Sequence, residues 1–461
     1  MTSKIDTHNA FSTERERRML SISSLFTALL FLVIAGCSPQ TSATQPITRS
    51  PAEPGAPELA ATVLAPDTEK MAKLEADILI AAFAGLATHG LDPKDYGLSR
   101  LKALEIDPEA QGKAMRDAWL LAATHLAHGR LDPRTLIPRT SATPVEGGLL
   151  ARLDAEGGPI ALAAALDGMA PQHPEYSTLR SELALEHLAI TVETDPVKLV
   201  EHDATIEKLR VNLERWRWLP RDLGPRYVFA NIAGLDVTGF EGDLIAAQFV
   251  AIFGKLDRET PTFSGKVEYV IFNPWWEVPD SIARNDKLPQ FRRDPGAVAR
   301  LGYRVLDKAG NTVNPADIDW NSVSARAFPY RLRQAPGPSN ALGQVKIIFP
   351  NAYNVYLHDT PDRALFDAEQ RLFSSGCIRV KDPLSLAEWL LRDTAGWDRV
   401  KIDAIVASGT ETRANLTAPI PVHVVYFTAV ADETCERARY LTDVYGRDAA
   451  VAQALKTELT P

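Results

Sequence analysis

Apolar residues in the first half of the chain recur with the spacing of an amphipathic α-helix. This spacing predicts helices over 67–89, 109–127, 160–166 and 176–188. Gly90 follows the first of them, as expected of a residue that ends a helix in the left-handed conformation. Together these segments predict a helical domain over 67–205.

From residue 227 onward the pattern is that of β-strands. Runs rich in β-branched and aromatic residues, bounded by glycine and proline turns, occur at 227–232, 247–254 and 267–272. No regular alternation of strands and helices follows, so we expect a mostly antiparallel β domain over 206–461. A long polar segment, 280–335, interrupts the strands and indicates an insertion. The fold class is therefore α+β, with a final helix over 448–459.

The N-terminus has the pattern of a targeting segment. Arginines precede an apolar run over 19–34, which is short for the ~20 residues that cross a bilayer. The run ends in Ile34-Ala35-Gly36-Cys37, which resembles the lipobox of bacterial lipoproteins. We therefore expect 1–37 to be a signal segment that is cleaved so that Cys37 becomes the lipidated first residue. The alternative is a single membrane-spanning anchor.

Residues 38–66 are rich in Ser, Thr, Pro and Ala, a composition that predicts a disordered tether without a core. A lipid anchor followed by a tether predicts a periplasmic protein held at a membrane. Ser38, directly after the cysteine, resembles lipoproteins that are sorted to the outer membrane.

Composition and charge argue against some classes of partner and of chemistry. The chain has 461 residues and a net charge of −9, and we find no Lys/Arg patch suited to phosphates, which argues against nucleic acid as a partner. There is no CxxC and no HExxH, so we expect no metal site and no cofactor. If Cys37 carries lipid, Cys377 and Cys435 remain. We expect both to be thiols, and we assign no role to Cys435.

The best candidate for chemistry is a cysteine and a histidine, Cys377 and His358. His358 ends a strand-like segment, and Cys377 lies on a turn of small residues before a helix predicted to begin at Asp382. A nearby imidazole can take the thiol proton and leave a nucleophilic thiolate. The alternative is a buried apolar cysteine and a structural histidine. The small flanking residues and the expected export favour the catalytic interpretation.

Further motifs lie in a fixed order around this pair. They occupy 212–220, 273–279, 336–343, 349–351, 356–361, 374–379, 419–422 and 443–448. With them, the C-terminal half of the chain resembles the L,D-transpeptidase family, and in particular its large scaffold-bearing branch. Two positions depart from the common motif, since Ser375 stands where histidine is frequent and Arg379 where asparagine is frequent.

The resemblance implies an N-terminal helical scaffold domain, a catalytic domain and a capping subdomain at 280–335. The large branch usually inserts a peptidoglycan-binding module between scaffold and catalytic domain. Here only 189–205 separates them, which is too short for a packed module, so we expect the module to be absent.

The resemblance also implies a reaction. Cys377 would attack a carbonyl of a tetrapeptide stem of peptidoglycan with His358 as base, and the amine of a second stem would resolve the thioester into a 3→3 cross-link. A carbapenem would acylate the same thiol. Water as acceptor would give an L,D-carboxypeptidase or endopeptidase, and a protein amine would give attachment of that protein to peptidoglycan. A further alternative is a non-catalytic, lipid-anchored wall-binding protein.

Backbone N–H groups next to the nucleophile are the expected donors of an oxyanion hole. They belong to Ser375, Gly376 and Cys377. Such donors would stabilise the negative charge that develops on the attacked carbonyl oxygen.

Three further side chains are candidates for substrate binding. Arg379 either clamps a stem carboxylate or pairs with a carboxylate at the following helix start. Tyr356 shares a strand face with His358 and either positions the imidazole, lines the pocket or packs in the core. Ser374 either forms hydrogen bonds in the site or caps the turn.

Overall fold

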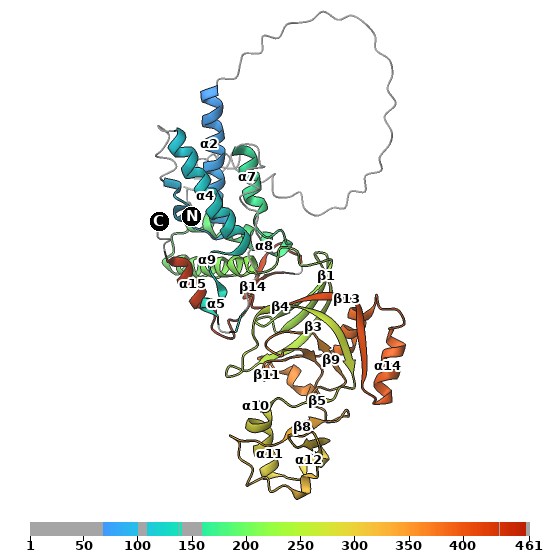
Figure 1. Cartoon of the computed structure of the whole chain (residues 1–461). Helices are drawn as coiled ribbons and strands as arrows, with labels where there is room; N and C mark the ends of the chain where they lie inside the picture. The colour runs from blue at the N-terminus through green and yellow to red at the C-terminus, as the bar shows by residue number, and fades with distance from the viewer. Residues whose placement is uncertain (1–67, 100–107, 138, 141–158, 433, 458–461) are drawn as a thin grey trace, which may run out of the picture. The chain divides into compact units, whose positions relative to one another are not determined.

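The computed structural model describes residues 68–99, 108–137, 139–140, 159–432 and 434–457 (Figure 1). The expected signal segment with Cys37 and the expected tether lie outside these residues. Pro66–Pro461 form one compact unit. Within the described ranges, every helix is too short or too polar to span a bilayer.

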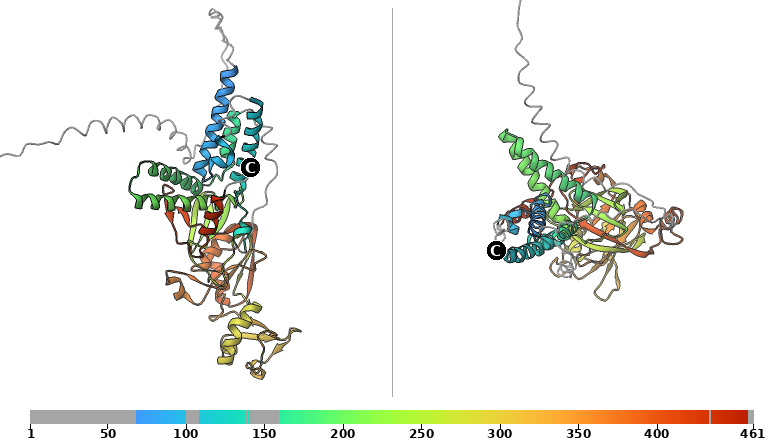
Figure 2. Two further views of the ribbon diagram at one scale, coloured as in Figure 1. Left: turned by 90° about the vertical axis from the view of Figure 1, so that its left-hand side faces the viewer. Right: turned by 90° about the horizontal axis from the view of Figure 1, so that it is seen from above.

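The N-terminal part of the described chain is helical, as its apolar spacing predicts. Its α-helices are α2 (Thr68–Gly85), α4 (Pro108–His128), α5 (Pro133–Leu136), α7 (Pro159–Gly168), α8 (Pro174–Val192) and α9 (Pro196–Arg217). Short 3-10 helices cover Leu86–His89 and Pro93–Tyr96. Helices α2, α4 and α7 run side by side (Figure 2) and bury large apolar side chains such as Phe83 and Trp119.

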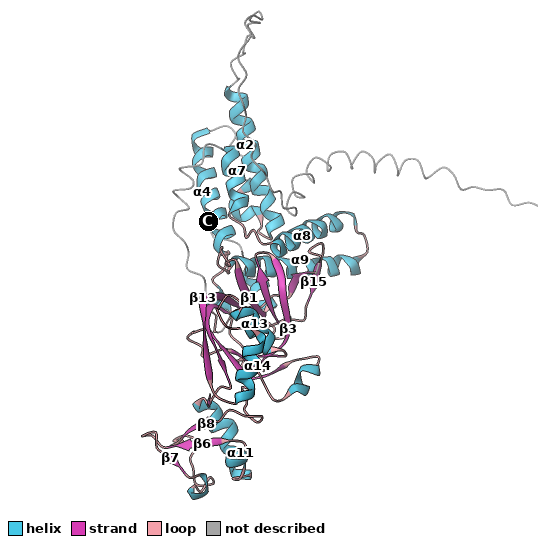
Figure 3. Cartoon of the chain, turned by 90° about the vertical axis from the view of Figure 1, so that its right-hand side faces the viewer, coloured by secondary structure: helices cyan, strands magenta, loops and turns pink. Residues whose placement is uncertain are grey.

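Helices α8 and α9 form a hairpin whose connection is 193–195 (Figure 3). Asp195 caps α9, since its Oδ1 accepts the Val197 N–H at 2.9 Å, and Pro196 fills the first helical position. The last turns of α9 are buried against the sheet. The Trp216 ring stacks between His173 and Phe427, with ring centroids 4.7 and 4.9 Å away. Helix α9 therefore joins the helical part to the β domain.

The β domain contains a closed sheet with the strand order β3-β12-β10-β9-β4-β13-β1-β2, in which β2 returns to β3 and β11 adds an edge beside β3. The strands are β1 (Arg226–Asn231), β2 (Asp236–Glu241), β3 (Leu244–Gly254), β4 (Phe263–Phe272), β9 (Val345–Ile348), β10 (Leu357–His358), β11 (Leu372–Ser374), β12 (Ile378–Val380) and β13 (Thr412–Val425). Most neighbours are antiparallel, as predicted. Parallel pairs also occur: β1 with β13, β10 with β12 and β11 with β3.

Other elements surround this sheet. Helices α13 (Pro383–Leu391) and α14 (Arg399–Ser408) follow β12, and β14 (Ala429–Ala431), β15 (Ala438–Tyr440) and α15 (Asp448–Lys456) follow β13. Leu386 and Leu390 of α13 and Ile402 of α14 pack into the core that Phe253 and Phe272 share with the other strands. This core holds the short strands β10 and β12 in place.

The segment 280–335 is a small folded unit. It contains α10 (Asp280–Ile282), a π-helix (Ala283–Lys287), α11 (Leu288–Arg293), α12 (Ala297–Arg300), β6 (Tyr303–Leu306), β7 (Thr312–Val313), a 3-10 helix (Pro315–Asp317) and β8 (Arg331–Gln334). With β5 (Trp276–Glu277), its strands form a second sheet in the order β5-β8-β6-β7. Phe291 and Trp320 lie in the core of this unit, so the polar insertion is ordered by apolar packing of its own.

Candidate active site

Strands β10 and β12 bring the candidate histidine and cysteine onto one face of the sheet. The two strands are parallel, with Leu357 opposite Ile378 and His358 opposite Arg379. Leu357 and Ile378 point into the core. Since successive side chains alternate between faces, His358 and Cys377 both lie on the opposite face. The two residues share Tyr356, Lys346 and Arg379 as neighbours, and their pairing as base and nucleophile stays a prediction.

The turn before Cys377 is closed by a serine. The Ser374 hydroxyl donates to the Cys377 carbonyl at 2.5 Å and accepts the Gly376 N–H at 3.1 Å. Gly376 has φ of +112°, a conformation that L-residues with a side chain rarely adopt. Of the two interpretations of Ser374, the structure therefore supports the turn cap.

The imidazole of His358 is oriented by the backbone. Its Nδ1 lies 2.5 Å from the Asp359 carbonyl, which only accepts, so Nδ1 carries the hydrogen and Nε2 is left as the basic nitrogen. Burial lowers the pKa of His358 to about 3, and the charges of Arg379 and Lys346 contribute in the same direction. The ring is therefore neutral near pH 7 and able to accept a proton.

The thiol of Cys377 is partly exposed and has polar neighbours on its own sheet face. The backbone N–H and the hydroxyl of Tyr356 both form hydrogen bonds to it, and its Sγ lies 3.8 Å from the Asn354 carbonyl. Burial raises the pKa of Cys377, while the Tyr356 hydrogen bonds and the charges of Lys346 and Arg379 oppose this shift. At rest the group is a thiol that needs a base.

Two family models match parts of this chain. Residues 225–406 match the family model of the L,D-transpeptidase catalytic domain, and residues 67–183 match that of a scaffold domain. The chain therefore contains an L,D-transpeptidase catalytic domain preceded by a scaffold domain. A relative from Haemophilus influenzae, described as a putative L,D-transpeptidase, is 38% identical over 243 residues, which are 52% of this chain and 48% of the relative. The chain thus spans about half the length of that relative.

The solved structure of L,D-transpeptidase 1 from Mycobacterium tuberculosis is also similar. It matches with 16% identity over 44% of this chain and 61% of that chain, and the TM-score is 0.18.

The oxyanion donors expected from the sequence differ in their availability. The Gly376 N–H already donates to the Ser374 hydroxyl, so in this conformation it is not available for an oxyanion. The Gly376 N–H is occupied because the Ser374 hydroxyl closes the turn. The N–H groups of Ser375 and Cys377 remain the predicted donors. The side chain of Ser375 accepts a hydrogen bond from Arg258 at 3.0 Å.

Arg379 does not pair with the start of the following helix. The Asp382 carboxylate there accepts the Ser385 N–H, whereas Arg379 lies 4.0 Å from Asp362 in the loop after β10. Within the described part of the chain, its buried Nε has no hydrogen-bond partner. The other alternative, a clamp for a stem carboxylate, stays a prediction.

Two further residues of the site, Lys346 and Trp276, do not follow from the sequence motifs. Lys346 lies opposite His358 in the β9–β10 pair, and its Nζ is 4.0 Å from the centre of the Tyr356 ring. Trp276 donates to the Tyr356 hydroxyl, which in turn contacts Cys377. A lysine between Val345 and Ile347 is the available sequence signal, because a charge inside a strand must lie on the face away from the core.

Two remaining predictions concern the other cysteine and metals. Cys377 and Cys435 are both thiols and not joined in a disulfide, as expected. Cys435 is exposed. Over the described ranges, His, Cys, Asp and Glu side chains form no group of three that could hold a metal ion.

Proposed function

We propose that this protein is a peptidoglycan L,D-transpeptidase that forms 3→3 cross-links through a thioester on Cys377. The observation that carries the proposal is the pairing of β10 with β12, which brings His358, with its neutral buried imidazole, next to the strand that begins directly after the partly exposed Cys377. A thiol with an adjacent base is the arrangement needed for acyl transfer.

The first half-reaction acylates the enzyme. Nε2 of His358 takes the Cys377 proton, and the sulfur forms a bond to the carbonyl carbon of the third residue of a tetrapeptide stem. The bond from that carbon to the nitrogen of the terminal D-alanine breaks, and His358 returns its proton to the departing amine. The products are free D-alanine and a thioester.

The second half-reaction transfers the acyl group. The side-chain amine of a second stem attacks the thioester while His358 takes a proton from it, and the carbon–sulfur bond breaks as the new amide forms. The proton returns to the sulfur. Lys346 and Arg379 place positive charge near the sulfur, which favours the thiolate at both steps.

The substrate contacts follow from the same sheet face. Arg379 is proposed to bind a stem carboxylate, since its Nε has no partner among the described residues. Tyr356 lines the site through its hydrogen bonds to the thiol. The N–H groups of Ser375 and Cys377 are proposed as oxyanion donors.

The cellular setting is part of the proposal. The sequence pattern ending at Cys37 supports a lipid-anchored protein of the periplasm, more consistent with the outer than the inner membrane because Ser38 follows the cysteine. Peptidoglycan stems would then be within reach of the tethered domain.

Purified protein mixed with tetrapeptide muropeptides tests the function. We expect disaccharide-peptide dimers with 3→3 linkage, seen by liquid chromatography and mass spectrometry, and no product from Cys377→Ser. The matched control Cys435→Ser should react as the wild type does, because Cys435 is exposed and lies between β14 and β15, outside the sheet that contains β10 and β12. Tripeptide monomers alone would indicate water as acceptor. An absence of any product, with intact wall binding, would favour the non-catalytic alternative.

A further inference from the structure

The turn that carries Cys377 is hydrogen-bonded to the loop that joins β3 to β4. Thr260, which is fully buried, donates through its hydroxyl to the Gly376 carbonyl at 3.1 Å. The same hydroxyl accepts the Gly254 N–H at 2.9 Å. One side chain thus connects the end of β3 to the residue immediately before the nucleophile.

Tyr445, from the segment between β15 and α15, holds this loop in place. Its hydroxyl donates to the Gly254 carbonyl at 2.6 Å and accepts the Thr260 N–H at 3.2 Å. The loop is tightly folded here, since a Cβ on Gly254 would lie 2.3 Å from the Arg258 carbonyl oxygen. Arg447 adds a 2.5 Å ion pair to Glu259 in the same loop.

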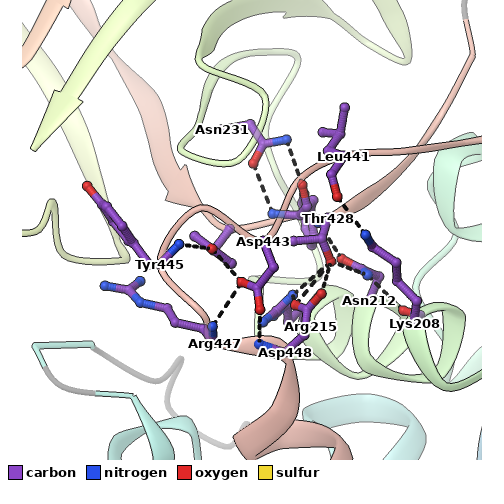
Figure 4. Close-up of polar contacts among 12 residues, drawn as sticks. Lys208, Asn212, Arg215, Asn231, Thr428, Leu441, Asp443, Tyr445, Arg447 and Asp448 are labelled. Atoms are coloured by element: carbon purple, nitrogen blue, oxygen red, sulfur yellow. Dashed lines mark hydrogen bonds and ion pairs between the residues drawn. The ribbon is translucent and has the colours of Figure 1, made fainter. Parts of the chain in front are cut away.

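The segment with Tyr445 is itself anchored by a carboxylate, as Figure 4 shows. Asp443 accepts the Tyr426 hydroxyl at 2.6 Å and the backbone N–H groups of Arg447 and Asp448 at 2.9 and 3.0 Å. The Tyr426 hydroxyl in turn accepts the Tyr445 N–H at 2.7 Å. Tyr445 therefore has both its backbone and its ring hydroxyl fixed.

The same network reaches helix α9. Asp448 pairs with the buried guanidinium of Arg215 at 2.6 Å and accepts from Thr428, and Asn212 binds both the backbone N–H and the hydroxyl of Thr428 (Figure 4). Helix α9 and residues 443–448 lie outside the ranges that match the scaffold and catalytic domains. The nucleophile turn is thus connected to parts of the chain beyond the matched catalytic domain.

We propose that Tyr445 is a positioning residue that, through Thr260, sets the backbone of the nucleophile turn for attack on the stem carbonyl. This role rests on the proposed function. The sulfur itself is not among the atoms that Tyr445 or Thr260 contacts. Loss of the Tyr445 hydroxyl should therefore change where the Cys377 backbone points while leaving the reactivity of the thiol itself unchanged.

Two reactions of the same thiol separate these effects. Acylation by a carbapenem or a tetrapeptide stem requires the sulfur and the oxyanion donors to be correctly positioned around the attacked carbonyl. Small displacements of these groups can lower the rate about a hundredfold. Alkylation by iodoacetamide needs only an accessible thiolate. Both can be followed on the full chain by mass spectrometry of the peptide that contains Cys377.

We expect Tyr445→Phe to slow acylation by about ten- to a hundredfold and to leave alkylation within about twofold of the wild type. Thr260→Val should behave in the same way, and Thr260→Ser should restore acylation because it keeps the hydroxyl. Tyr440→Phe is the matched control, since this tyrosine lies on β15 and is partly exposed. It should match the wild type in both reactions.

Each outcome is informative. Unchanged acylation in Tyr445→Phe and Thr260→Val would overturn the positioning role while the proposed function stands. A parallel change of acylation and alkylation would also overturn it, because it would indicate a loosened fold. A wild-type protein that is alkylated at Cys377 but never acylated would overturn the proposed function, and the positioning role with it.

Discussion

At the scale of single residues, burial shifts the pKa values of His358 and Cys377 in opposite directions, because it favours the neutral form of each group. It lowers the pKa of His358 to about 3 and raises the pKa of Cys377, so both groups are neutral near pH 7. The alternative resting state, a thiolate beside an imidazolium, would need the reverse shifts. The site thus resembles enzymes in which the base acts during the attack rather than before it.

This electrostatic state predicts how the thiol responds to pH. The thiolate fraction of Cys377 should grow as pH rises through the alkaline range, and alkylation by iodoacetamide should increase with it, without a plateau at acidic pH. Lys346→Met should shift the curve further toward alkaline pH, because the lysine charge opposes the upward shift of the thiol pKa. Rates measured on the Cys377 peptide over a pH series check this. A plateau below pH 6 would instead indicate a preformed ion pair.

At the scale of secondary-structure elements, helix α9 depends on a fully buried ion pair. Arg217 binds Glu214 one turn earlier at 2.7 Å, with neither side chain exposed, and also donates to the His89 carbonyl and the Tyr176 hydroxyl. The other oxygen of Glu214 accepts the Leu131 N–H. A pair of this kind links α9 to the rest of the helical part.

Arg217→Met would leave the Glu214 carboxylate buried without its cation. We expect this substitution to lower the free energy of unfolding by about 3–5 kcal/mol, measured by urea denaturation. The control Lys113→Met breaks the exposed ion pair with Asp117. This substitution should change the free energy of unfolding by less than about 1 kcal/mol. Equal effects of the two substitutions would contradict the assigned role of the buried pair.

The secondary-structure elements also show which parts of the fold can be predicted from the sequence. The helix expected over 109–127 is α4, Pro108–His128, because its apolar spacing and its boundaries are local signals. The helix expected over 67–89 instead ends at Gly85 and continues as a 3-10 turn. The contact between Thr260 and Gly376 spans 116 positions and depends on the pairing of β3 with β11 and β12. No local pattern could have predicted it.

The same distinction holds within the site. His358 and Cys377 could be proposed from the sequence because each lies in a recognisable motif next to a strand. The alternatives for Arg379 and Ser374 stayed open because they depend on partners, Asp362 and the Cys377 carbonyl, whose positions follow from the tertiary fold.

At the scale of the whole molecule, buried histidines make stability depend on pH. Burial lowers the pKa of four of them to about 4, namely His89, His125, His173 and His423, and the pKa of His358 to about 3. In the unfolded chain these imidazoles take up protons below about pH 6.5. The unfolded state therefore binds more protons than the folded state between pH 6.5 and 4, and stability must fall as pH falls through this window.

Two buried carboxyls oppose this trend. Burial raises the pKa of Glu175 to about 7 and that of Asp236 to about 6, so each favours the folded state at lower pH. Because the histidines are more numerous, we expect the melting temperature to decrease from pH 7 to pH 4.5. His423→Phe should make the decrease shallower. A melting temperature that is constant or rises toward pH 4.5 would contradict this assignment of the histidines.

The most direct test of the account is the mass of the intact protein after incubation with a tetrapeptide stem or a carbapenem. We predict one acyl adduct, located on the peptide that contains Cys377 and absent in Cys377→Ser. His358→Ala should slow its formation by several orders of magnitude, since base and nucleophile act as a unit. An adduct on another residue, or one that forms equally fast without His358, would contradict the account.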